Sequence, residues 1–82
     1  MTTAANKALA VMSNVCQVPV SKLKPEMHLI RDLALDSAIT MELLMALESE
    51  LSLEISDLEA AQLVTVGDVL AFINERLPPA ST

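Results

Sequence analysis

The sequence contains one cysteine, one glycine, one phenylalanine, and neither tryptophan nor tyrosine. The single cysteine, Cys16, cannot form an internal disulfide, and at helical spacing it is more typical of a small buried hydrophobe than of a nucleophile. The single glycine, Gly67, excludes a glycine-rich loop of the kind that cradles phosphates. With so few aromatic side chains the core must be built from Leu, Ile, Val, Met and Ala, a composition that favours helices.

Groups that catalyse reactions or bind metals are equally scarce. His28 is the only histidine, and no pattern in the sequence would bring it to Cys16 or Ser37, so we expect a surface loop residue rather than a general base. Structural zinc needs several Cys or His ligands, and the carboxylates lack the spacing of a calcium loop, so we expect no metal site. The sequence shows neither a long apolar run nor the start of a signal peptide. We therefore expect a cytoplasmic protein without a membrane span.

Acidic and aliphatic residues are what the sequence has in abundance. Of its 82 residues 52% are hydrophobic, and the formal net charge is -6. Between Asp32 and Glu75 there are ten acidic residues and no Lys or Arg. Such a field repels nucleic acids and anionic lipid surfaces but speeds encounters with basic protein patches. A chain of this length has room for one thin core, so we expect a single domain over 1–82, present as a monomer, without a large enclosed active site.

The apolar pattern predicts an all-α fold, a small four-helix bundle with three main helices and one short helix. The first helix is expected from about residue 3 to residue 16, where apolar positions recur at steps of three and four. Residues 18–35 hold Pro19 and Pro25 and show no sustained period. This region is therefore expected to be a long ordered loop between the first and second helices, held by its apolar side chains.

The remaining helices are marked by their starts. A second helix is expected over 38–51, a run without Gly or Pro, and a short third helix over 56–62, which opens with capping-box spacing. The last helix is expected over 66–77, where a clean apolar stripe ends at two prolines. Residues 78–82 are expected to be a frayed tail.

The second expected helix has a distinctive start and outer face. Asp36 and Ser37 stand at its beginning, and either side chain can accept hydrogen bonds from the first free backbone N–H groups. A helix N-terminus also stabilises negative charge, so a phosphodiester on Ser37 is chemically permitted. Further along, Met41 and Met45 lie beside the core stripe. They are either exposed, and then available to a partner or to a second copy of the chain, or they fill the core.

The segment Leu35-Asp36-Ser37 is preceded by Asp32-Leu33 and followed by Met41-Glu42-Leu43. A leading helix and a long loop come before it, and a short acidic helix and the helix start Thr65-Val66-Gly67-Asp68 come after it. This ordered set, which covers nearly the whole chain, resembles the acyl carrier protein family. The resemblance implies that a separate phosphopantetheinyl transferase attaches 4′-phosphopantetheine to Ser37, next to Asp36. Acyl intermediates would then ride on this arm as thioesters, and the protein would be a carrier rather than an enzyme.

The same resemblance implies two further sets of residues. In the family, acidic and apolar residues of the second helix meet basic patches on acyl-loading, synthase and acyltransferase enzymes. Here these residues are Met41, Glu42, Met45 and Glu48. The family also shelters its acyl chain among the helices, and the corresponding lining would consist of Leu47, Ile55, Leu63 and Val66.

Three positions depart from the family pattern. Ala38 stands where a larger aliphatic residue is usual, Ile39 where an acid is common, and Ser49 interrupts the acidic run. We therefore expect a carrier for a specialised lipid or polyketide pathway rather than for housekeeping fatty acid synthesis. The absence of a Gly-Gly pair before Asp36 argues against a peptidyl or aminoacyl carrier. The alternatives that stay open are a small acidic helical protein-interaction adaptor without a prosthetic group, a peptidyl or aminoacyl carrier protein, and an enzyme subunit.

Overall fold

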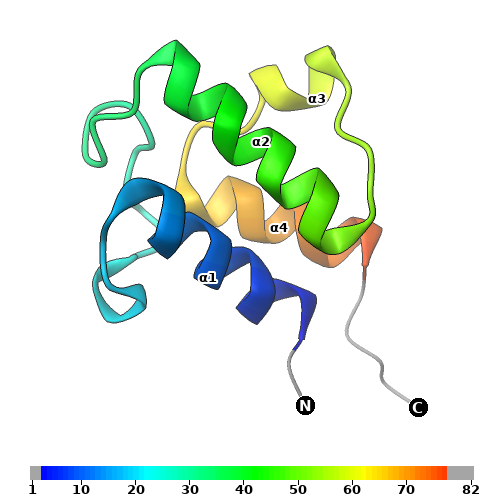
Figure 1. Ribbon diagram of the computed structural model, residues 1–82, viewed down its shortest axis with the longest axis horizontal. Coiled ribbons are helices and arrows are strands. Elements are labelled where there is room, and N and C mark those ends of the chain that lie inside the picture. Colours follow the sequence, from blue (N-terminus) through cyan, green and yellow to red (C-terminus); the bar gives the residue numbers. More distant parts are fainter. Residues whose placement is uncertain (1–2, 78–82) are drawn as a thin grey trace.

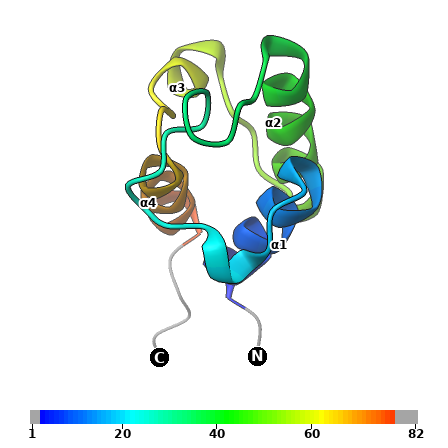
Figure 2. The same ribbon diagram turned by 90° about the vertical axis from the view of Figure 1, so that its left-hand side faces the viewer.

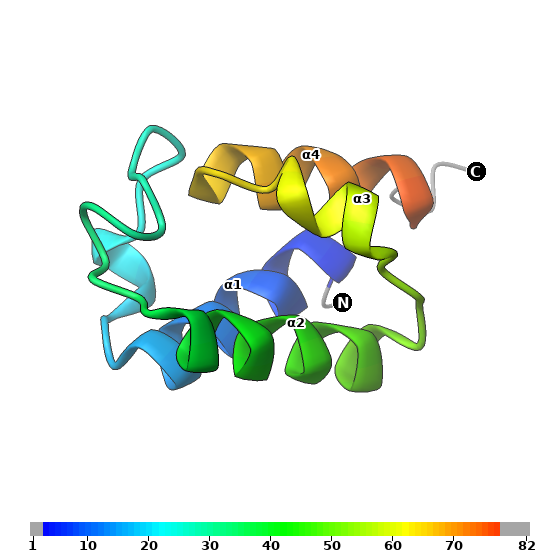
Figure 3. The ribbon, with the colours of Figure 1, turned by 90° about the horizontal axis from the view of Figure 1, so that it is seen from above.

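Four α-helices and one short 3₁₀ turn follow one another along residues 3–77, the part of the chain that the computed structural model describes. The helices are α1 (Ala4–Cys16), α2 (Ser37–Leu51), α3 (Asp57–Ala61) and α4 (Val66–Arg76), and the 3₁₀ turn is Val20–Lys22. The helix α1 runs antiparallel to α2 and α4 (Figure 1). The four helices surround a common core (Figure 2), and from above α3 lies between α2 and α4 (Figure 3). The predicted all-α fold with four helices, one of them short, is confirmed.

The tail predicted at 78–82 lies outside the described residues. Among the helices of residues 3–77, none combines the length and the apolar character that crossing a membrane requires.

Side chains cap the start of every helix. Thr3, Asp36, Ser56 and Thr65 are the N-caps of α1, α2, α3 and α4, and the caps of α3 and α4 are complete capping boxes. All four starts therefore lie within a residue or two of their predicted positions, because capping is a local property of the sequence. Two helix ends are less visible in the sequence. They are left-handed C-caps at Gln17 and Ser52, which are neither glycine nor asparagine.

The buried apolar side chains form one cluster drawn from α1, α2, α4 and the long loop. It consists of Ala8, Met12, Leu23, Leu29, Leu33, Leu35, Leu43, Leu47, Leu51, Val66, Val69 and Ile73. Four of these residues belong to the loop between α1 and α2, so the prediction that apolar side chains hold this loop is confirmed. Ile39 and Leu44 of α2 are half-buried and pack beside this cluster or at its edge.

The long loop is also fastened to the start of α4 by its backbone. Three hydrogen bonds join the two segments: Leu29 N to Val64 O (2.9 Å), Val66 N to Met27 O (3.0 Å) and Gly67 N to Pro25 O (2.8 Å). The approach at Gly67 is so close that a Cβ there would lie 3.0 Å from the Pro25 carbonyl oxygen. The loop therefore reaches α2 as a fixed segment rather than as a free linker.

Candidate functional site

Ser37 is the first residue of α2, and it is exposed. The preceding residue, Asp36, is the cap: its Oδ1 accepts a hydrogen bond from the Ile39 N–H at 2.8 Å, and its carbonyl oxygen accepts one from the Thr40 N–H at 2.9 Å. Because Asp36 caps the helix, the Ser37 hydroxyl is not needed for that purpose. It stands at the positive end of the helix dipole, where a phosphate would be stabilised, and another protein can reach it.

The turn that leads to α2 is organised by His28, a role that the sequence analysis missed. The Nδ1 atom of His28 accepts hydrogen bonds from the Ile30 N–H (3.2 Å) and the Arg31 N–H (3.1 Å). The carboxylate of Asp32 accepts a hydrogen bond from the His28 N–H at 2.6 Å. His28 lies in the loop, as expected, but it is half-buried and its ring has a structural role that the sequence did not indicate. Nothing in the local sequence signalled this, because a histidine ring can fold back on its own turn only when the backbone has the right shape.

The backbone just before Ser37 contains one strained residue, Ala34. Ala34 has a φ of 55°, in the left-handed region, which costs a residue with a Cβ about 1–2 kcal/mol. The next residue, Leu35, is buried, and its N–H donates to the Leu29 carbonyl oxygen at 3.2 Å. Burial of Leu35 and this hydrogen bond offset the strain and fix the direction from which the chain enters α2.

A pocket of about 350 Å³ lies between this turn, the first part of α2, the end of α3 and the residues just after α3. It is lined by His28, Leu29, Ile30, Thr40, Ala60, Ala61, Leu63 and Val64. The Oγ1 atom of Thr40 is buried and has no hydrogen-bond partner among the described residues. Thr40 follows Ser37 by three positions, so both residues lie on the same side of the helix. The pocket thus offers largely apolar walls to a group that extends from Ser37, and the Thr40 hydroxyl is buried directly beside them.

The exposed side of α2 carries three of the four residues predicted to contact partners. Met41 and Met45 are 59% and 63% exposed, so they do not fill the core, and Glu42 is exposed as well. Glu48 is different, because it is half-buried and its carboxylate accepts a hydrogen bond from the Ile55 N–H at 3.0 Å. It holds the segment between α2 and α3, a role that the sequence analysis did not anticipate.

The four residues predicted to line an acyl-chain space have different surroundings in the part of the chain that the structure describes. Leu63 lines the pocket beside Thr40, whereas Ile55 lines a separate hollow next to Arg76. Leu47 and Val66 are fully buried in the core. The sequence analysis missed Thr40 as a pocket residue. Its only signal was a hydroxyl at helical spacing from the apolar residues Leu43, Leu44 and Leu47 of the same helix.

The two other groups considered for chemistry have ordinary structural roles. Cys16 is half-buried at the end of α1, and burial raises the pKa of its thiol, which favours the protonated and less nucleophilic form. The Nδ1 atom of His28 is occupied by two backbone N–H groups. Within residues 3–77, no three His, Cys, Asp or Glu side chains gather into a group that could hold a metal ion.

Comparisons with known proteins agree with this geometry. Residues 6–73 match the family model described as the phosphopantetheine attachment site. The chain is 44% identical over 71 residues to an acyl carrier protein of Thermosynechococcus vestitus, an alignment that covers 87% of this chain and 88% of that protein. It is 38% identical over 66 residues to an acyl carrier protein of Helicobacter pylori strain J99, covering 80% of this chain and 85% of the relative.

Proposed function

The chain belongs to the acyl carrier proteins, and from this premise we propose that Ser37 is the residue to which phosphopantetheine is attached. The observation that carries the proposal is the position of this serine. Its side chain is exposed at the first position of α2, and the cap is provided by Asp36 instead. The hydroxyl is therefore accessible to a transferase, and the helix N-terminus favours the phosphodiester that results.

The residues next to Ser37 fit such an arm. The arm supplies a terminal thiol on which acyl groups are carried as thioesters. It also contains amide groups. The Thr40 hydroxyl is buried and has no hydrogen-bond partner among residues 3–77, and it would donate to an amide oxygen of the arm once its side chain rotates toward the pocket. The remaining wall of the pocket is apolar, which suits an aliphatic chain. Asp36 would act indirectly, by capping α2 and so holding Ser37 in place.

The acyl chain itself would enter the pocket beside Thr40 and meet Leu63 there. Ile55 belongs to the neighbouring hollow, and Leu47 and Val66 are core residues. A chain would contact these three only by separating side chains that are packed together in this structure. An acyl chain long enough to reach them would therefore replace contacts between these side chains with contacts to the chain itself, which an aliphatic core can accommodate.

The exposed side of α2 would be the docking surface for partner enzymes. It presents Met41 and Met45 beside Glu42, which combines apolar contact area with negative charge. Partners with basic patches would include a phosphopantetheinyl transferase and the enzymes that load, elongate or transfer the acyl group. Ala38 is a small exposed residue, and Ile39 is half-buried and uncharged. This part of the surface is thus less acidic than in the family pattern, which supports a specialised lipid or polyketide pathway.

The proposal is tested by intact mass after incubation with coenzyme A and a broad-specificity phosphopantetheinyl transferase. Wild-type protein should gain the mass of one phosphopantetheine, and Ser37→Ala should gain none. Since Asp36 rather than Ser37 caps α2, the Ser37→Ala variant should retain its stability to within about 0.5 kcal/mol. Its folded state is checked by circular dichroism.

Ser49→Ala is the matched control, because it removes an exposed hydroxyl from the same helix. It should be modified like the wild type. If folded wild-type protein gains no mass with more than one transferase, Ser37 is not an attachment site and the adaptor alternative is favoured. Modification of Ser37→Ala would place the arm on another residue.

A further inference from the structure

The helix α3 depends on its surroundings for its position. It has five residues, fewer than an isolated helix needs for stability, and none of them is buried. Its Leu58 side chain is 75% exposed and points away from the core. Apart from its own capping box, α3 must therefore be held in place by groups from neighbouring elements.

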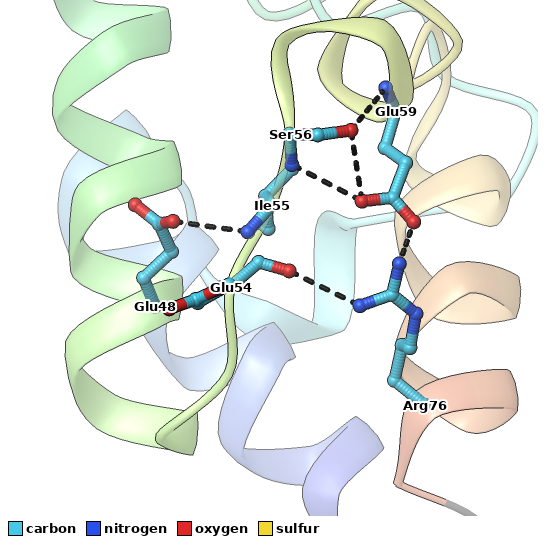
Figure 4. Close-up of polar contacts among 6 residues, drawn as sticks. All are labelled: Glu48, Glu54, Ile55, Ser56, Glu59 and Arg76. Carbon is cyan, nitrogen blue, oxygen red and sulfur yellow. Dashed lines mark hydrogen bonds and ion pairs between the residues drawn. The ribbon is translucent and has the colours of Figure 1, made fainter.

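Arg76, the last residue of α4, contacts both α3 and the segment before it (Figure 4). Its Nη1 atom donates to the Glu54 carbonyl oxygen at 3.1 Å, and its Nη2 atom forms an ion pair with the Glu59 carboxylate. Its guanidinium also lies over the Phe72 ring, 4.8 Å from the ring centre, which limits the orientations it can adopt. A planar guanidinium can make these contacts together, whereas the point charge of a lysine cannot.

The Glu59 carboxylate connects this contact to the start of α3. Its Oε1 atom accepts hydrogen bonds from the Ser56 N–H (3.1 Å) and the Ser56 hydroxyl (3.0 Å), while its Oε2 atom faces Arg76. From the other side, Glu48 of α2 accepts the Ile55 N–H. The segment 54–59 is thus held between α2 and α4. Arg76 is the only Lys or Arg after Arg31 in the sequence.

The position of α3 determines the shape of the pocket next to Ser37. Ala60 and Ala61 of α3, with Leu63 and Val64 just after it, form one side of that pocket, and Thr40 of α2 lies on the other. We propose that Arg76 is a positioning residue that latches α3 against α4 and thereby limits how readily the pocket between α2 and α3 opens. The part that concerns an acyl chain rests on the proposed carrier function, whereas the latch itself does not.

The latch is tested first in the unmodified protein by amide hydrogen exchange. In Arg76→Gln the amides of Ala60, Gln62 and Leu63, which donate within and just after α3, should exchange about threefold to tenfold faster. This range is expected for one surface ion pair combined with one charge-assisted hydrogen bond. Core amides of α2 and α4 should keep their rates. Arg31→Gln, which removes the same charge from the long loop, should leave α3 unchanged.

Two further variants separate the latch from a general loss of stability. Glu59→Gln keeps an oxygen that can accept the Ser56 N–H but removes the charge that pairs with Arg76. It should speed exchange in α3, and the double variant should be no faster than Arg76→Gln alone. Equal α3 exchange in Arg76→Gln and Arg31→Gln, or a uniform increase across all helices, would overturn the proposal.

The consequence for cargo is tested on protein that carries an octanoyl thioester. Cleavage of this thioester by hydroxylamine should be faster in Arg76→Gln than in wild type or Arg31→Gln, because a looser α3 shields the chain less. Equal cleavage rates in variants that do show faster α3 exchange would overturn the link to the pocket. If Ser37 cannot be loaded at all, the carrier function fails, and the exchange experiment still decides whether Arg76 is a latch.

Discussion

At the scale of single residues, a carboxylate takes part in capping the start of each of the later helices. Asp36 caps α2, Glu59 completes the capping box of α3, and Asp68 completes that of α4. The first of these matters most for the proposed function, because a serine that had to cap its own helix would be less available for modification. A short carboxylate one residue upstream leaves the hydroxyl of Ser37 unoccupied.

Asp68 gives this capping a measurable pH dependence. Hydrogen bonds from the Thr65 and Val64 N–H groups to its carboxylate stabilise the ionised form and lower the pKa of Asp68. A carboxyl group whose pKa is lower in the folded state stabilises the fold above its unfolded pKa, and this contribution is lost as the pH falls. We therefore expect urea unfolding to show Asp68→Asn as less stable than wild type at pH 7. The difference should shrink below about pH 4.

Glu50→Gln is the control for this prediction. It removes an exposed carboxylate of α2 that takes part in none of the helix caps. Its difference from wild type should not follow the same course between pH 7 and pH 3. A stability difference for Asp68→Asn that stays constant over this range would contradict the assigned role of the charge.

At the scale of elements, the loop between α1 and α2 behaves as part of the core structure. Its leucines are buried, its turn is organised by His28, and its backbone is bonded to the start of α4. Gly67 permits this contact, since a side chain there would press on the Pro25 carbonyl oxygen. The three elements that line the pocket beside Ser37, namely the long loop, α2 and α3, consequently differ in rigidity. The loop and α2 are anchored in the core, whereas α3 is held mainly by polar contacts.

This difference predicts how the elements respond to cargo. As the acyl chain attached at Ser37 is lengthened, methyl signals of Thr40, Ala60 and Leu63 should shift first in NMR spectra, because these residues line the pocket. Signals of Leu47 and Val66 should shift only with longer chains, which must part the core to reach them. Val11, in a separate groove between α1 and α2, is the reference position.

Two results would contradict this order of contacts. One is a shift confined to Met41 and Met45, which would place the chain on the outer surface of α2. The other is a response at Val11 as large as that at Leu63, which would indicate a general loosening of the bundle rather than a chain in the pocket between α2 and α3.

At the scale of the whole molecule, the distribution of charge favours basic partners. The net charge is -6, and four of the five basic residues precede α2 in the sequence. The fifth, Arg76, is paired with Glu59. The helix α2 itself carries three glutamates and no Lys or Arg, so the charge that it contributes around its exposed methionines is negative. Such a surface draws partners in by long-range attraction and gives modest affinity once they are bound.

Docking should consequently be sensitive to salt. Affinity for a phosphopantetheinyl transferase, measured by titration calorimetry, should fall as sodium chloride rises from about 50 mM to about 500 mM, because exposed charges are screened. Glu42→Gln should weaken binding and reduce its dependence on salt. Glu26→Gln, which removes an exposed charge from the long loop instead, should have a smaller effect. Binding that does not depend on salt would exclude electrostatic docking through α2.

The helix boundaries and the candidate attachment site of this protein can be predicted from the sequence, because the interactions that determine them join residues close together in the chain. Helix starts are set by Asp36, Ser56 and Thr65, each within three residues of the N–H group that it caps. The buried stripe of α4 follows from helical spacing alone. The candidate attachment site is likewise a short ordered motif, so Ser37 could be singled out and its place at the start of α2 foreseen.

Other features were decided only by the tertiary structure, because they depend on residues far apart in the chain. Arg76 donates a hydrogen bond to the carbonyl oxygen of Glu54, which lies 22 positions earlier, and no sequence pattern around either residue predicts that contact. Thr40 of α2 becomes a pocket residue only because the fold brings Leu63 and its neighbours next to it, and its buried hydroxyl lacks a hydrogen-bond partner among the described residues. Periodicity tells which face of a helix is buried, but it does not tell which helix packs there. The sequence thus specified the helices and the serine, and the packing of α3 between α2 and α4 created the pocket beside them.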